Sequence, residues 1–591
     1  MAVFLVIVCI LMAERRSVVY EKTERLLECL DPSVFQEEKF VKEPECLIVW
    51  DSADSNSVKA RREIASVLAQ MRIPFEEQDG REEPALSPAY DNYVLALSDY
   101  SVLGEGILDL FDWVEDGSNL LVMCPPYVDA YYQVVSGRMG IQDTGHEPFE
   151  LDKIVFKTGF MVGGMGQTLE VSDPFDSSNR IFLDQDCRVH LTGGGEEEYP
   201  VLWEHPYGQG NVVCVNLNIY EKAYRGFYAA AYSLLSDVCV YPVINGAAFY
   251  LDDFPSPVPA GEGSYIKRDY NMDIERFYTN VWWPDMSNLA KEHGIRYTSM
   301  VIENYSDEHQ LPLAGNQDTQ RFLYFGNEVL NQGGEIGYHG YNHMPLVLEN
   351  FDYGDAFESY YPWKSEDDIR GAMTELKNFC SELYPREAFH VYVPPSNILS
   401  EEGRRILAED FLDIQAVASI YFEGAHGYSQ DFMVSEDGIV ETPRITSGLL
   451  IDSYMRTAAL SELNFHYVNS HFLHPDDALD EDRGAALGWQ NLYTNLSAYM
   501  EWLYNFAPEI RRLVGTEMAG AVERYYFLDT LIEKREGEIE IRLSNFQDEA
   551  WLFARVKEGY VSSVQGGSAV RVADGLYLVQ ASEDTVRLIL E

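Results

Sequence analysis

The stretch that decides how this chain folds and what it does is Phe249-Tyr250-Leu251-Asp252-Asp253-Phe254, an apolar run that ends in two adjacent aspartates. Two further segments carry histidine at similar positions. They are Gly337-Tyr338-His339-Gly340-Tyr341-Asn342-His343 and Val468-Asn469-Ser470-His471-Phe472-Leu473-His474. One Asp and two His suit a divalent ion such as zinc and leave positions open for water and substrate. A second Asp would serve as general base, and a further histidine as general acid.

The order of these motifs resembles the polysaccharide deacetylases of carbohydrate esterase family four. The likeness covers roughly residues 244–515. It implies a distorted (β/α) barrel that uses a bound metal to remove N- or O-acetyl groups from a glycan. The family's pattern also implies the roles of five residues: Asp252 as base, Asp253, His339 and His343 as metal ligands, and His474 as acid.

The wider layout is similar to the deacetylases of bacterial exopolysaccharide operons, such as the Pel type. This resemblance implies a polysaccharide substrate, an extracellular or biofilm glycan, and a partner in the export machinery. The chain starts with an apolar run, Met1 to Ala13, followed by Arg15 and Arg16. The run is shorter than the ~20 residues of a spanning helix. We expect residues 1–20 to be a truncated signal or membrane anchor, with a buried first strand as the alternative, and we expect an extracellular or cell-surface location.

One segment departs from the family pattern, which usually shows Arg-x-Pro-x-Tyr. Here the matching stretch runs from Val391 to Asn397, with Tyr392 and Ser396 at the arginine and tyrosine positions. The missing cation must then come from elsewhere in the sequence. The candidates are Arg386, Arg444 and Arg456.

Two histidines compete for the role of acid. His471 and His474 are three residues apart, so in a strand they would point to opposite faces. His474 lies at the expected end of its strand and is followed by Pro475-Asp476, and a nearby aspartate would orient the ring and raise its pKa. We therefore favour His474. Aromatic residues near the motifs are candidates for stacking on sugars: Tyr250, Tyr338, Tyr341 and Trp363.

Charge limits the classes of partner. The chain has 43 basic and 97 acidic residues, a net charge of −54. Such a chain repels the phosphates of nucleic acid and anionic lipid surfaces. The excess favours either solubility in salt or attraction of a cationic glycan. The eight cysteines are scattered without a CxxC pair, which is typical of buried thiols in a large chain.

The length indicates several domains. Residues 45–240 alternate strands and helices as βαβαβ, which predicts a doubly wound parallel sheet resembling a class I glutamine-amidotransferase-like domain. Cys124 follows the third strand, but Pro125 and Pro126 follow it where a nucleophile turn needs small residues, so we expect this domain to be non-catalytic. Residues 244–515 repeat strand–helix alternation with the motifs at strand ends, as in a barrel.

The last part of the chain, residues 520–591, has a different predicted secondary structure. Residues 520–591 show strand after strand without helix, the first from Arg524 to Ile532, and predict a small β-sandwich that either caps the barrel or binds glycan. Two other functions remain open for the whole protein. One is an inactive glycan-binding protein. The other is a metal-independent glycoside hydrolase that pairs Asp252 with Glu303 or Asp476.

Overall fold

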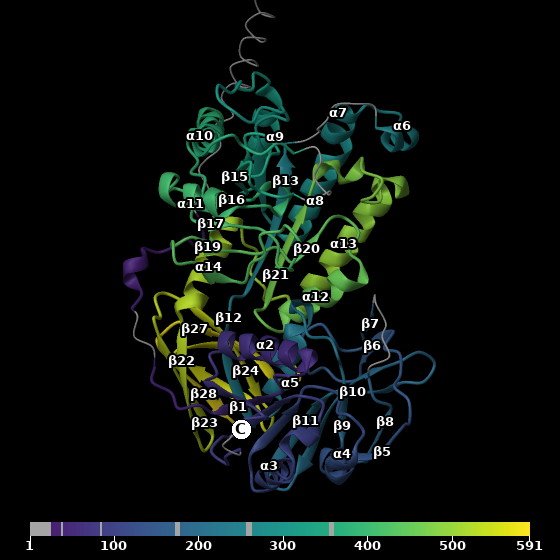
Figure 1. Ribbon diagram of the computed structural model, residues 1–591. Helices are drawn as coiled ribbons and strands as arrows, with labels where there is room; N and C mark the ends of the chain where they lie inside the picture. Colours follow the sequence, from purple (N-terminus) through teal and green to yellow (C-terminus); the bar gives the residue numbers. More distant parts are fainter. Residues whose placement is uncertain (1–24, 37–39, 83–85, 172–177, 256–262, 354–359) are drawn as a thin grey trace, which may run out of the picture.

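The computed structural model describes residues 25–36, 40–82, 86–171, 178–255, 263–353 and 360–591. These residues form a mixed α/β protein with two large sheets, two small sheets that face each other, and the short pair β5 (Ile141–Thr144) and β8 (Ile181–Leu183) (Figure 1). The sheet that carries the histidine motifs lies at one end of the molecule, and the first sheet and the small sheets lie at the other. The predicted signal or anchor at residues 1–20 falls outside the described residues. Within the described part of the chain, no helix is both long and apolar enough to cross a membrane.

The first sheet begins with the predicted βαβαβ pattern and then changes direction. The strands β2, β1, β3, β4 and β11 run parallel, whereas β10, β9, β6 and β7 continue the same sheet as antiparallel neighbours. The expected doubly wound parallel sheet is therefore only part of a mixed sheet. The reason is local: β10 and β11 are joined by Gly208-Gln209, a turn too short for a parallel crossover, and Gly208 has φ 61°. The bounds are β1 Cys46–Trp50, β2 Phe75–Asp79, β3 Asn92–Ala96, β4 Asn119–Val122, β6 Lys153–Phe156, β7 Thr168–Glu170, β9 Arg188–Gly193, β10 Tyr199–Tyr207 and β11 Gly210–Val215.

Helices cover both faces of this sheet. Successive side chains of a strand point to opposite faces, and β1 shows the division: Ile48 packs in one buried cluster with α2, while Leu47 packs in another with α3. Helix α5 joins α2 on its face, and α4 joins α3. The bounds are α2 Ser55–Gln70, α3 Gly106–Glu115, α4 Ala130–Val135 and α5 Arg225–Ser233.

The second large sheet has the strand order of a barrel that is open at one point. Its order is β18-β19-β17-β16-β15-β14-β13-β21-β20, and all neighbours except β18 and β19 run parallel. Among the described strands, the two edge strands β18 and β20 do not pair, so the sheet is a curled half-barrel and the expected (β/α) barrel is not closed. The bounds are β13 Gly246–Phe254, β14 Tyr297–Ile302, β15 Glu335–Gly340, β16 Val391–Tyr392, β17 Ala416–Val417, β18 Met433–Val434, β19 Val440–Glu441, β20 Thr446–Ser447 and β21 Val468–Leu473.

The helices between these strands follow the 3.6-residue pattern of the sequence. In the longest predicted one, Ser365 caps the N-terminus by accepting a hydrogen bond from the backbone N–H of Asp368. Ile369, Met373 and Leu376 form its buried face. The bounds are α8 Trp283–His293, α9 Gln320–Asn331, α10 Glu366–Leu383, α11 Glu401–Asp410, α12 Ser453–Leu463 and α13 Trp489–Phe506.

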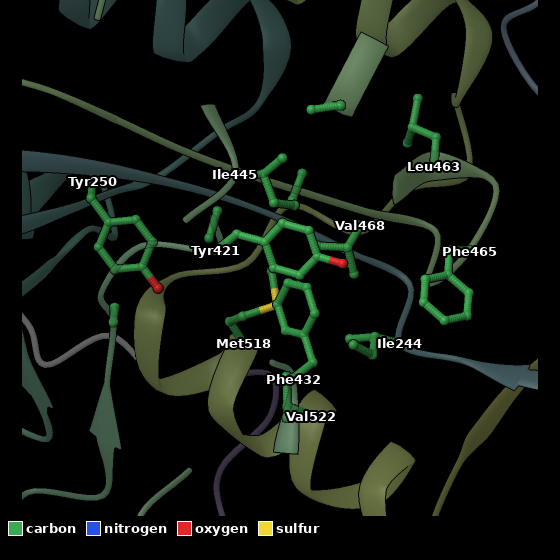
Figure 2. Packing of buried hydrophobic residues seen from close by; sticks show 14 of the residues in the cluster. Ile244, Tyr250, Tyr421, Phe432, Ile445, Leu463, Phe465, Val468, Met518 and Val522 are labelled. Atoms are coloured by element: carbon green, nitrogen blue, oxygen red, sulfur yellow. The ribbon is translucent and has the colours of Figure 1, made fainter. Parts of the chain in front are cut away.

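Helix α14 (Gly515–Phe527) covers the amino ends of the parallel strands. The backbone N–H of Gly515 donates to Thr298 at the start of β14, and that of Thr516 donates to Glu335 at the start of β15. Figure 2 shows Met518 and Val522 of this helix beneath the rings of Tyr421 and Phe432. The strand predicted from Arg524 was therefore wrong in its first residues, because the apolar face of α14 continues to Phe527.

The two small sheets enclose a separate buried cluster. Their orders are β12-β24-β27-β26 and β22-β23-β28-β25. Strand β12 precedes the barrel in the sequence, yet all six of its residues, from Val238 to Val243, pair with β24. The sandwich is thus built from both sides of the barrel segment. The bounds are β12 Val238–Val243, β22 Asp529–Arg535, β23 Glu538–Ser544, β24 Ala550–Val556, β25 Val561–Gln565, β26 Gly567–Ala573, β27 Leu576–Ala581 and β28 Thr585–Leu590.

Candidate metal centre

The predicted site residues come from three strands whose carboxyl ends meet. Asp252 and Asp253 lie at the end of β13, His339 is next to last in β15, and His474 directly follows β21. Since β21, β13, β14 and β15 are consecutive parallel neighbours, these ends share one edge of the sheet, with α14 at the opposite edge. The sheet therefore brings four side chains from three distant segments of the sequence to the same end of the strands.

A bulge lets both aspartates face this rim. The register between β13 and β14 shifts between Leu251 and Phe254, and Asp253 has φ 54°, in the left-handed region. In a regular strand the two neighbouring side chains would point to opposite faces. The bulge turns one of the two side chains so that both face the same way. The left-handed backbone that this requires costs free energy and is typical of functional sites.

Asp253, His339 and His343 form a compact group of potential ligands. Asp253 Oδ1 lies 3.3 Å from His339 Nε2 and 3.5 Å from His343 Nε2. His339 Nδ1 lies 2.7 Å from the carbonyl oxygen of Val393, and His343 Nδ1 lies 2.7 Å from the hydroxyl of Tyr360. These outer contacts fix both rings with Nε2 turned toward Asp253, as in metal-ligating histidines.

The chemistry of this group fits a divalent ion. Asp253 Oδ1 is buried and has no hydrogen-bond partner among the described residues, although two imidazole nitrogens face it. Burial lowers the pKa of His343 to about 4, so its ring is neutral at pH 7. Burial alone would raise the pKa of Asp253, but His343 and His339 hold it well below its usual range. A carboxylate such as Asp253 and a neutral imidazole such as His343 are in the protonation states that a metal requires of its ligands.

Asp252 is held by a cation that the sequence left undecided. Arg444 donates from Nη1 to Asp252 Oδ2 and from Nη2 to the side-chain oxygen of Asn397, and its guanidinium lies 4.0 Å from the centre of the Phe472 ring. Of the three arginines considered, the structure places Arg444 at the site, whereas Arg456 donates to the carbonyl of Ile451. Asp252 Oδ1 has no hydrogen-bond partner in the described part of the chain.

His474 lies near the same oxygen of Asp252 that Arg444 holds. Its Nε2 lies 4.0 Å from Asp252 Oδ2, and its Nδ1 lies 3.4 Å from Asp477 Oδ1. Burial lowers the pKa of His474, but the hydrogen bond and charge of Asp477 outweigh this and raise it to about 9, with smaller contributions from Asp253 and Asp252. Arg483 in turn donates to Asp477 at 2.8 Å. The orienting carboxylate is thus Asp477, and not the Asp476 that follows Pro475 in the sequence.

His471 lies away from this group. It is fully buried, its Nδ1 lies 2.9 Å from Thr446 Oγ1, and its ring packs against Phe249 and Tyr499. Its surroundings are those of a core residue.

Two members of the site, Asp477 and Arg483, were not identified from the sequence. The one available signal was the helix-start pattern His-Pro-Asp-Asp, in which His474 is the N-cap of the short helix Pro475–Ala478 and the carboxylate of Asp477 accepts a hydrogen bond from the backbone N–H of His474.

The candidate ligands and their neighbours line one cavity of ≈ 550 Å³, and His471 does not belong to its lining. The lining residues of this cavity described so far include Asp252, Asp253, His339, His343, Arg444, His474, Asp477 and Arg483. Its walls also include Tyr305, Ser396 and Phe472. The four aromatic residues expected to stack on sugars are buried at 2% exposure or less, whereas Tyr305 is 43% exposed at the rim. Tyr305 lies beyond the end of β14 and outside the sequence motifs, and it was not among the predicted residues.

The first sheet shows no such arrangement at Cys124. Its thiol is buried, and burial raises its pKa to about 12. A thiol in this environment stays protonated at neutral pH and is a poor nucleophile. The geometry agrees with a structural role for Cys124.

The chain belongs to a family of uncharacterised proteins conserved in bacteria (DUF2194), which it matches over residues 168–578. No curated protein matches the chain. Several solved structures are distantly similar. A putative polysaccharide deacetylase from Mycobacterium smegmatis is 16% identical with a TM-score of 0.28, covering 46% of this chain and 91% of that one.

Two further structures are similarly distant. A β-galactosidase from Bacillus circulans sp. alkalophilus is 13% identical with a TM-score of 0.24, and the match covers 34% of this chain. The chain spans only about a third (33%) of the length of that enzyme. A cytoplasmic protein from Salmonella typhimurium LT2 is 14% identical with a TM-score of 0.25, covering 32% of this chain and 99% of that one. The distant structural neighbours thus include carbohydrate-active enzymes, a deacetylase and glycosidases.

Proposed function

We propose that this protein is a metal-dependent hydrolase that removes acetyl groups from a polysaccharide. The observation that carries the proposal is the meeting in one cavity of a His-His-Asp group with an unpartnered Asp253 oxygen, a second carboxylate and a histidine. Asp253, His339 and His343 would hold the ion, for which we propose zinc. When bound, such an ion supplies Lewis-acid activation of water and of the acetyl carbonyl.

The remaining chemistry falls to the chain's own side chains. Asp252 Oδ1 accepts the proton of the attacking water, while Arg444 holds the other oxygen and keeps the carboxylate in place. His474, whose Nε2 lies 4.0 Å from Asp252 Oδ2, donates a proton to the leaving amine or alkoxide. Asp477 fixes its ring and favours the protonated form that a general acid needs.

The substrate we propose is an extracellular or biofilm glycan, met outside the cell or at its surface, with an exopolysaccharide export system as partner. Two features support a polysaccharide as substrate: the open cavity and the exposed ring of Tyr305 that lines it. A tyrosine has an apolar ring face and a polar hydroxyl, and so it suits a sugar, which has an apolar face and hydrated hydroxyl groups. The net charge of −54 supports attraction of a glycan that becomes cationic as amino groups are released.

The test is elemental analysis of the purified protein, followed by acetate release from a panel of N- and O-acetylated polysaccharides. We expect about one divalent ion per chain, loss of activity on exhaustive chelation and its return when zinc is added. A protein that binds the ion but releases no acetate would be an inactive glycan-binding protein. A protein without the ion would contradict the metal centre.

A glycoside hydrolase is the second candidate, and one observation favours it. Asp476 lines the same cavity as Asp252, and burial, together with the charge of Asp253, raises its pKa to about 6, as suits a carboxylic general acid. This function needs no metal. Release of reducing sugar ends that survives chelation would establish it in place of deacetylation.

A further inference from the structure

A second cavity adjoins the metal centre. Its volume is ≈ 320 Å³, at the lower end of the roughly 300–1,000 Å³ of small-molecule sites. It lies between the chain that follows β14 and the start of α9, and it shares Asp253 and Tyr305 with the first cavity. The two cavities are therefore neighbours, as adjacent subsites for successive sugars of one glycan would be.

Glu303 gives this cavity a carboxylate with an unused oxygen. The residue is 0% exposed, and its Oε1 accepts a hydrogen bond of 2.9 Å from the backbone N–H of Asn316. The side chain of Asn316 donates back to the carbonyl of Glu303, which fixes the pair. Oε2 has no hydrogen-bond partner among the described residues. A buried carboxylate oxygen without a donor is costly, and a ligand that donates hydrogen bonds would remove that cost.

The charge around Glu303 indicates the sign of the ligand. Apart from Asp253, whose charge the proposed metal ion would offset, two carboxylates line the cavity, Glu303 and Asp318, against one guanidinium, Arg321. Burial raises the pKa of Glu303 to about 7, with the Asn316 hydrogen bond acting against this and the charge of nearby Glu375 adding to it. Such a site repels anions and is stabilised by a cation.

The cation that fits is organic. Among the described residues, two groups have the spacing of metal ligands, and neither contains Glu303. A protonated amine offers three donors and a positive charge to a carboxylate. Tyr305, exposed between the two cavities, offers a face to the sugar that carries the amine.

We propose that this second cavity is a glycan subsite that binds the free ammonium group of an amino sugar, with Glu303 as its partner. Together with the proposed deacetylation, on which this inference rests in part, it identifies the substrate as an amino-sugar polysaccharide that is already partly deacetylated. The enzyme would then act next to sugars from which the acetyl group has been removed.

The experiment compares binding of a glucosamine tetrasaccharide with that of an N-acetylglucosamine tetrasaccharide by titration calorimetry. The variants are Glu303→Gln, which keeps the shape and removes the charge, and Asp318→Asn at an exposed position of the same cavity. The matched control is Glu382→Gln, which removes one charge from an exposed position of α10. Melting temperature and metal content are measured for each.

We expect the wild type to prefer the glucosamine tetrasaccharide. Glu303→Gln should reduce that preference by about 10- to 100-fold, the scale of one charge-assisted hydrogen bond. Asp318→Asn should reduce it several-fold and Glu382→Gln should not change it. If Glu303→Gln does not fold, Asp318→Asn decides, and an unchanged preference in that variant overturns the proposal.

Other outcomes also count against the subsite. A folded Glu303→Gln protein with the wild-type preference, or a wild type without preference, overturns it. So does a second divalent ion per chain that disappears with Glu303→Gln, which would make this a metal site. Acetate release by the wild type is measured separately. If the wild type releases acetate but Glu303→Gln keeps the preference for the glucosamine tetrasaccharide, only the subsite is refuted. If Glu303→Gln selectively loses that preference but the wild type releases no acetate, only the deacetylase activity is refuted.

Discussion

Arg444 donates a hydrogen bond to Asp252 from a position 192 residues further along the chain. Both side chains are almost completely buried, with exposures of 1% and 2%. The guanidinium is always charged and planar, so it holds the carboxylate in one orientation. The remaining oxygen, Asp252 Oδ1, has no hydrogen-bond partner among the described residues, and in the proposed reaction it accepts the proton of the attacking water.

This pair should be important for stability. Removing one partner of a buried ion pair leaves an uncompensated charge and costs about 3–5 kcal/mol. We expect Arg444→Met to lower the free energy of unfolding by that amount in urea denaturation. Adding Asp252→Asn should recover a large part of the loss, since the stranded charge is then gone. A double variant no more stable than Arg444→Met would show that the two residues are not coupled.

Loss of a ligand should remove metal and activity together. Asp253→Ala or His339→Ala deletes one of three protein ligands, so the ion is no longer held tightly. The measurement is metal content and acetate release on the same preparation. His390→Ala is the control, because that ring contacts the carbonyl of Asp413 outside the cavity. Full occupancy in both ligand variants would disprove the assignment.

The adjacent carboxylate should separate catalysis from binding. Asp252→Asn keeps nearly the same shape, so the protein should retain its metal and its affinity for glycan. Turnover should fall by roughly 10²–10⁴-fold, the usual contribution of a general base. Loss of metal in this variant would make Asp252 a ligand and reverse the roles of the two aspartates. Unchanged turnover would place the base elsewhere.

His471 should make the fold sensitive to acid. Burial lowers its pKa from 6.5 to about 4, so below pH 6.5 the unfolded chain binds a proton that the folded chain does not. The resulting loss of stability is absent at pH 7.5 and reaches roughly 2 kcal/mol at pH 5. The variant His471→Gln has no titrating group at this position and so lacks this pH-dependent loss of stability. The difference in unfolding free energy between wild type and variant should therefore shrink by that amount from pH 7.5 to 5, and an equal difference at both values would refute the prediction.

The sandwich should unfold with the barrel. Phe553 on β24 is fully buried, and its ring lies 5.7 Å from that of Tyr241 on β12 and 5.5 Å from that of Tyr467 just before β21. Phe553→Ala should cost about 3–5 kcal/mol and shift a single cooperative transition. Val570→Ala, at a 40% exposed position of β26, should change little. A separate, earlier transition in Phe553→Ala would show that the sandwich is independent of the barrel.

The sequence came closest where the signal was local. The strands predicted at Cys46–Trp50, Tyr297–Val301 and Glu335–His339 agree with β1, β14 and β15 within one residue at either end. The helix cap at Ser365 was also readable, because a cap depends on residues within one turn. Errors arose where pairing between distant segments decides which sheet a strand joins. Strand β12 directly follows the segment that forms the first sheet, but it pairs with β24 in one of the small sheets.

For the site, the sequence alone determined which residue types were available: an Asp-Asp pair after a strand, an HxxxH pair and a late histidine. It could not determine that Asp253 adopts φ 54° or that Arg444 and Asp477 complete the group. The physical reason is that strand registers, the bulge in β13 and the choice among three arginines depend on packing between segments up to some 200 residues apart. Those contacts exist only when the parallel strands meet at one rim, so the sequence determined the candidate ligands and the tertiary structure determined their geometry.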